Sequence, residues 1–121
     1  MNEKSQLTPI AHPVVELPVA DVERAQQHYC SALGFKVAWL WPDKSIGAVS
    51  REDAAIFLRK TEPPFDAVNL WVFAPNIDAT LRELQDFGAN IIEPLEKKSW
   101  GLMQFTVQDI DGHRLTFHHD L

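Results

Sequence analysis

The stretch DVERAQQHYCSALGF, residues 21–35, carries the start signal, the body and the stop signal of one helix. Asp21 is a favoured N-cap residue, because its carboxylate accepts hydrogen bonds from free N–H groups in the first helical turn. Apolar residues recur at helical spacing along the next twelve positions. Gly34 then supplies the left-handed conformation that commonly ends a helix. We therefore predict a helix from Val22 to Leu33.

The same order of signals returns in NIDATLRELQDFGA, residues 76–89. Asn76 is the second N-cap candidate and Gly88 the second stop, so the caps lie 55 positions apart (21 and 76) and the glycines 54 (34 and 88). Because the offsets between the two caps and between the two stop glycines agree to within one residue, the two stretches indicate an internal repeat. The alternative, two unrelated helix-and-strand units in one domain, leaves this agreement unexplained.

Strand-like stretches flank each helix in the same order, one before it and three after it. They cover residues 14–19, 35–40, 45–50 and 54–59 in the first half, and residues 69–73, 90–92, 102–107 and 113–118 in the second. A linker with Pro63 and Pro64 separates the halves, and Asp111-Gly112 marks a tight hairpin. We predict an α+β single domain over residues 1–121. It has two βαβββ modules, module one at about 12–60 and module two at about 67–119, which form a curved mixed sheet with a cup and carry the helices on the outer face.

Composition limits the functions open to this chain. Its 121 residues are 45% hydrophobic and 23% charged, as is typical of a globular domain. A net charge of −6 argues against a nucleic-acid partner, which needs a basic surface, and weakly favours a cationic ligand. Cys30 is the single cysteine, which excludes an internal disulfide and a multi-cysteine zinc site. Since residues 1–9 are polar and no apolar run has membrane length, we expect a cytoplasmic protein without a membrane partner.

Alternation along the strands separates aliphatic faces from aromatic ones. Leu70 and Val72 share one face of their strand, which suits packing against a helix, whereas Trp71 and Phe73 share the other. A solvent-facing sheet rarely exposes such large rings. The aromatic face is therefore expected to line a cavity or to form a dimer interface.

Four tryptophans supply large flat surfaces, and such rings serve protein cores and ligand sites about equally well. They are Trp39, Trp41, Trp71 and Trp100. Trp100 stands in Ser99-Trp100-Gly101, next to the charged residues 96–98, which we interpret as a loop. This position predicts a ligand platform at the rim of the cup.

Three groups of residues carry a family resemblance. They are Val19-Ala20-Asp21-Val22-Glu23-Arg24-Ala25 with Leu33-Gly34-Phe35, then Asn76-Ile77-Asp78-Ala79 with Phe87-Gly88-Ala89 and Trp100-Gly101, and finally Asp109-Ile110-Asp111-Gly112-His113-Arg114-Leu115. With these motifs the chain resembles the vicinal-oxygen-chelate superfamily of glyoxalases, extradiol dioxygenases, fosfomycin-resistance enzymes and bleomycin-resistance proteins. Ile110 replaces the proline usual in the last motif. The resemblance covers nearly the whole chain and implies the repeated βαβββ fold, which hosts many chemistries.

The resemblance also implies where a metal would bind. Enzymes of the superfamily hold a divalent ion through His or Gln residues in the first strand of each module and Glu residues near the ends of the fourth and eighth strands. The corresponding positions here are Val14, Asn69, Thr116 and Phe57 or Leu58. Because Val, Phe and Leu have no donor atom and Asn and Thr are weak ligands, we expect no metal, no cofactor and no catalytic residues of the usual type. A non-standard site would use His12, Glu16 and His118.

A metal-free aromatic cup resembles the bleomycin-resistance branch, whose members are homodimers that sequester the drug unchanged. The resemblance implies a small, aromatic, cationic ligand, stacked in clefts that strands of both chains form. The expected ligand-binding residues are Trp39, Trp41, Phe57, Trp71, Phe73, Trp100 and Glu16. The function so implied is drug binding that confers resistance. Two alternatives remain, a metal-dependent glyoxalase-, dioxygenase- or transferase-type enzyme with non-standard ligands, and a dimer whose aromatic faces form only the interface.

Overall fold

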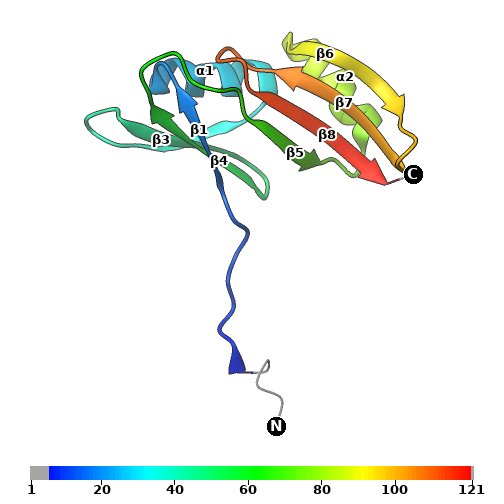
Figure 1. Cartoon of the computed structure of the whole chain (residues 1–121), viewed down its shortest axis with the longest axis horizontal. Coiled ribbons are helices and arrows are strands. Elements are labelled where there is room, and N and C mark those ends of the chain that lie inside the picture. Colours follow the sequence, from blue (N-terminus) through cyan, green and yellow to red (C-terminus); the bar gives the residue numbers. More distant parts are fainter. Residues whose placement is uncertain (1–5, 121) are drawn as a thin grey trace.

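The computed structural model describes residues 6–120, which form two strand–helix–three-strand units in succession (Figure 1). Module one comprises β1 (Val15–Val19), α1 (Val22–Leu33), β2 (Lys36–Leu40), β3 (Ile46–Arg51) and β4 (Ala54–Lys60). Module two comprises β5 (Asn69–Phe73), α2 (Ile77–Phe87), β6 (Asn90–Lys97), β7 (Leu102–Gln108) and β8 (Arg114–Asp120). The predicted order of elements is confirmed. Neither of these two helices is long and apolar enough to cross a membrane.

Each module forms its own four-stranded mixed sheet. The strand orders are β1-β4-β3-β2 and β5-β8-β7-β6, with the first strand of each module parallel to the fourth and the other neighbours antiparallel. The two sheets lie side by side (Figure 1), and no strand pairing joins them within residues 6–120. The α+β fold of two βαβββ modules is confirmed, and its curved surface consists of two open sheets.

Both helices begin and end where their residue types predict. The side chains of Asp21 and Asn76 each accept a hydrogen bond from the backbone N–H three residues further on, at 2.9 and 3.4 Å. Gly34 and Gly88 follow the last turns with φ of 72° and 83°. This left-handed conformation suits glycine, because a Cβ would crowd the backbone there.

Each helix covers one face of its own sheet, and the buried core lies between the helices and the sheets. α1 contacts β2, β3 and β4, while α2 contacts β7 and β8. Gly47 of β3 lies directly beneath α1, where a Cβ would be 2.6 Å from Gln26 Nε2 and 2.9 Å from Val22 Cγ1. A residue without a side chain therefore lets the helix approach the strand this closely.

The turn between β7 and β8 joins the two modules. His113 in this turn is fully buried, and its Nδ1 accepts a hydrogen bond from the Val68 N–H at 3.0 Å. The proton of the neutral ring is therefore on Nε2, which donates to the carbonyl of Pro18 at 2.6 Å. Asp111 accepts a further bond from the Ala20 N–H at 3.1 Å. The hairpin that carries much of the family resemblance thus also holds module two against β1.

The strand after α2 is longer than predicted. β6 (Asn90–Lys97) continues past the expected end at Ile92 and includes Glu96, which the sequence placed in a loop. β6 is an edge strand, where Pro94 is tolerated because its missing N–H need not serve a neighbour. The pairing with β7 also shifts register twice. These irregularities interrupt the alternation by which a strand is recognised in sequence.

Candidate functional site

Module one places two of the predicted ligand-binding rings together, on the face of its sheet turned away from α1. Trp39 of β2 and Phe57 of β4 both lie opposite Ala48 of β3. Their ring centroids are 5.0 Å apart and their planes meet at 72°, a favourable edge-to-face arrangement. We call this surface, together with Glu16 and Arg59, the open face of module one.

Glu16 is paired with a cation of the protein itself. Arg59 Nε lies 2.7 Å from Glu16 Oε1, and Arg59 Nη2 lies 3.1 Å from Oε2. This hydrogen bonding holds the pKa of the Glu16 carboxyl below its usual value. Sequence reasoning missed Arg59, because the parallel pairing that sets it opposite Pro18 joins distant parts of the chain. A ligand cation would have to displace Arg59 before it reached Glu16.

Module two carries two rows of side chains across three neighbouring strands. One row runs from Phe73 of β5 through His118 of β8 to Gln104 of β7, and the next from Trp71 through Thr116 to Thr106. The ring of His118 makes edge contacts with Trp71 at 5.6 Å and with Phe73 at 5.7 Å. These six residues define the open face of module two. Trp71 and Phe73 are 57% and 59% exposed, so large ring surfaces are available to a ligand or a second chain.

Besides His118, the polar side chains of this face are uncharged amide and hydroxyl groups. The hydroxyls of Thr106 and Thr116 lie 3.1 Å apart, and the indole Nε1 of Trp100 donates to Gln104 Oε1 at 3.1 Å. The buried Nδ1 of His118 has no hydrogen-bond partner within residues 6–120. Gln104 and Thr106 were not among the predicted site residues, although the alternation that singled out Trp71 also applies to their strand.

Trp100 lies in the turn between β6 and β7 and is 63% exposed. Its bond to Gln104 fixes one edge of the indole at the margin of the open face of module two. This location agrees with the expected rim position, and the site role of Trp100 stays a prediction.

A single copy of the chain does not gather all the predicted ligand-binding residues. In the described part of the chain, the two sheets make no ring contact with each other: Trp39 and Phe57 lie on one sheet, and Trp71 and Phe73 on the other. Trp41 follows β2 and is half exposed, with no ring partner among the same residues. The predicted aromatic residues therefore form two separate open faces.

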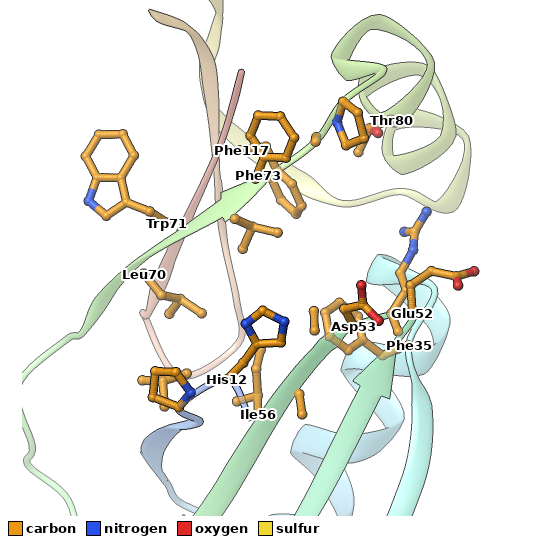
Figure 2. A pocket seen from close by; sticks show the side chains of 18 residues that line it. His12, Phe35, Glu52, Asp53, Ile56, Leu70, Trp71, Phe73, Thr80 and Phe117 are labelled. Carbon is orange, nitrogen blue, oxygen red and sulfur yellow. The ribbon is translucent and has the colours of Figure 1, made fainter. Parts of the chain in front are cut away.

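An open cleft of about 740 Å³ lies between the modules, on the side of the sheets that carries the core (Figure 2). Its floor is apolar and includes Phe35, Ile56, Leu70 and Phe117. Figure 2 shows the ring of Trp71 pointing away from this cleft. Of the predicted ligand-binding residues only Trp71 and Phe73 border it, so this cleft is distinct from the two open faces.

The positions at which the resemblance places metal ligands do not fit an ion here. Leu58 is fully buried in the core, and the Thr116 hydroxyl is occupied by Thr106. Among residues 6–120 no three His, Cys, Asp or Glu side chains are grouped so that they could hold an ion. His12, Glu16 and His118 therefore do not assemble into a site within one copy.

Comparison with known proteins gives a family match over most of the chain. The model of the Glyoxalase/Bleomycin resistance protein/Dioxygenase superfamily matches residues 10–117. No curated protein matches the sequence.

Solved structures with the same fold include proteins of several kinds. TioX from Micromonospora sp. ML1 is 26% identical, with a TM-score of 0.80 over 92% of this chain and 99% of that one. A bleomycin-binding protein, solved in complex with bleomycin, is 17% identical, with a TM-score of 0.78 over 93% of this chain and 100% of that one. A glyoxalase/bleomycin resistance protein/dioxygenase from Alicyclobacillus acidocaldarius is 15% identical, with a TM-score of 0.75 over 89% of each chain.

Proposed function

Since the chain belongs to the Glyoxalase/Bleomycin resistance protein/Dioxygenase superfamily, we propose that it binds and sequesters a small aromatic, cationic compound of the bleomycin type. Binding requires no metal and leaves the compound unchanged, so its consequence in the cell is resistance. The observation that carries this proposal is the open face of module two, where Trp71 and Phe73 flank His118 and remain more than half exposed.

The chemistry of the open faces suits binding better than catalysis. Exposed indole and phenyl rings offer stacking surfaces for planar heteroaromatic groups. Beneath them, Gln104 and the two threonines are buried and bonded to Trp100 and to each other, so they support the rings rather than carry a catalytic group. Sequestration requires affinity alone, so such a surface is sufficient for it.

The complete binding site is proposed to form in a homodimer. One copy exposes two aromatic faces on separate sheets. Among residues 6–120, the rings of one face do not contact the rings of the other face. If the open face of module one in one copy covers the open face of module two in its partner, each dimer contains two clefts lined by rings on both sides. Ligand binding and dimerisation are then thermodynamically linked. We propose that this dimer works in the cytoplasm.

The test is a titration of intrinsic tryptophan fluorescence with metal-free bleomycin in the presence of EDTA. Saturable quenching at about one drug per chain, with a Kd of about 1 μM or below (about −8 kcal/mol), is expected. Lysozyme serves as a tryptophan-containing control for non-specific quenching. A flat titration would remove the drug assignment and leave the fold and family unchanged.

A further inference from the structure

Lys98 places its ammonium group between a carboxylate and an aromatic ring. Lys98 Nζ lies 3.0 Å from Glu96 Oε2 and 5.8 Å from the centroid of the Trp100 ring. The Lys98 side chain is only 21% exposed, which is low for a lysine in a surface turn. The lysine stem is therefore largely covered, while its ammonium group lies at the surface between the Glu96 carboxylate and the Trp100 ring.

The two groups around this ammonium are those that recognise organic cations. A carboxylate supplies the opposite charge, and the face of an indole attracts a cation through its quadrupole. We propose that Glu96 and Trp100 form a subsite for the ammonium group of a ligand, which Lys98 fills in the free protein and vacates on binding. This inference rests on the proposed function, because it names where the cationic part of the sequestered compound binds.

The framework of the subsite is fixed independently of the Lys98 side chain. Glu96 lies in β6 opposite Gln104, and Gln104 in turn holds the indole of Trp100. The backbone of the turn is closed by a bond from the Lys98 N–H to the Leu102 carbonyl at 2.7 Å. The lysine side chain can therefore swing out while the carboxylate and the ring keep their places.

Of the carboxylates Glu16 and Glu96, only Glu96 permits this exchange. Glu16 is bound by Arg59 through two nitrogens, and the planar guanidinium is pre-organised for that contact. Lys98 reaches Glu96 through one nitrogen on a flexible stem, and half-exposed ion pairs of this kind are weak. A ligand cation therefore competes successfully at Glu96 and not at Glu16.

The experiment uses choline as the probe and its uncharged isostere 3,3-dimethylbutan-1-ol as the control, at matched ionic strength. The readout is the indole N–H signal of Trp100 in a ¹H–¹⁵N spectrum of the full chain, assigned with Trp100→Phe. In Lys98→Met the Kd for choline is expected to fall about three- to ten-fold relative to the unmodified protein. Glu96→Gln is expected to weaken choline binding by a similar factor, and Lys97→Met serves as the neighbouring control without effect.

Unchanged backbone N–H signals of Leu102 and Gln104 in the ligand-free Lys98→Met protein show that the turn is intact, and Lys98→Gln provides a second variant if they change. The inference is overturned if Lys98→Met and the unmodified protein respond alike to choline, or if the uncharged isostere moves the Trp100 signal equally. Choline binding together with a flat bleomycin titration would refute the drug assignment and retain the subsite. Bleomycin binding without any choline effect would retain the drug assignment and refute the subsite.

Discussion

The hydroxyl of Tyr29 in α1 donates a hydrogen bond of 2.6 Å to Oδ2 of Asp109, in the turn between β7 and β8. Both side chains are buried, and the bond joins module one to module two. The other carboxylate oxygen, Oδ1, accepts from the backbone N–H groups of Asp111 and His113, both at 2.9 Å. One buried carboxylate thus closes the hairpin of one module and anchors the helix of the other.

Tyr29→Phe is expected to lower the free energy of unfolding by about 1.5–3 kcal/mol, because it removes a buried hydrogen bond to a charged acceptor. Urea unfolding followed by far-UV circular dichroism measures the change. Thr61→Val is the matched control, since it removes an exposed hydroxyl that bonds to the Arg59 carbonyl. A loss no larger in Tyr29→Phe than in Thr61→Val would show that the Asp109 contact contributes little.

Stability is also expected to fall at alkaline pH because of Tyr29. Burial, and then the charge of Asp109, raise the pKa of the Tyr29 hydroxyl well above its usual value. The folded chain therefore keeps this proton while the unfolded chain releases it above about pH 10. The contribution of protonated Tyr29 is complete below that pH and is lost as the pH rises above it. Between pH 8 and pH 10.5 the urea midpoint of the unmodified protein should fall further than that of Tyr29→Phe. Equal falls in the two proteins would contradict this.

Gly47→Ala is expected to destabilise the protein by about 1–3 kcal/mol, because the new methyl group has no space beneath α1. Gln26 cannot simply turn aside, since its Nε2 donates to the carbonyls of Trp39 and Ala48 at 3.0 and 3.3 Å. Val22→Ala clears the other neighbour of the new methyl. Urea unfolding of Gly47→Ala, of Val22→Ala and of the variant with both changes gives a double-mutant cycle. The double variant should lose less stability than the sum of the single losses, and simple additivity would argue against a steric cause.

Local signals in the sequence sufficed for the helices and for the aromatic faces. The caps Asp21 and Asn76 act within one helical turn, and the alternation that exposes Trp71 and Phe73 acts within one strand. Such features depend on neighbours in the chain, so they can be read without knowledge of the fold. The predicted fold class followed from them.

The contacts that sequence reasoning missed are non-local or irregular. Arg59 meets Glu16 only because β1 pairs with β4 in parallel, and Gln104 meets His118 only through the register of β7 with β8. The full length of β6 was hidden by Pro94 and by two register shifts. Each of these depends on which strands become neighbours and in what register, and no single stretch of the sequence specifies that.

Glu16→Gln is expected to leave the Kd for bleomycin within about two-fold, because an exposed carboxylate already held by its own arginine has little attraction left for a ligand. The Arg59 hydrogen bond also keeps the pKa of the Glu16 carboxyl low, so this pairing persists into mildly acidic solution. The fluorescence titration measures the Kd of Glu16→Gln and of the unmodified protein at pH 7 and at pH 5.5, and the two should agree within about two-fold at both pH values. A large loss of affinity in Glu16→Gln would mean that the ligand displaces Arg59 after all.

Trp100→Ala and Trp71→Ala are expected to separate ligand binding from dimerisation. Trp100 is 63% exposed and lies in a turn at the rim, so its removal should weaken bleomycin binding at least about ten-fold, as for a stacked anchor residue, and spare the dimer. Trp71 lies within the sheet face that is proposed to meet the partner, and its removal should weaken the dimer as well as binding. Sedimentation equilibrium and the fluorescence titration measure the two properties on the same samples. If Trp100→Ala binds bleomycin like the unmodified protein while Trp71→Ala only dissociates the dimer, the aromatic faces form an interface and the sequestration proposal fails.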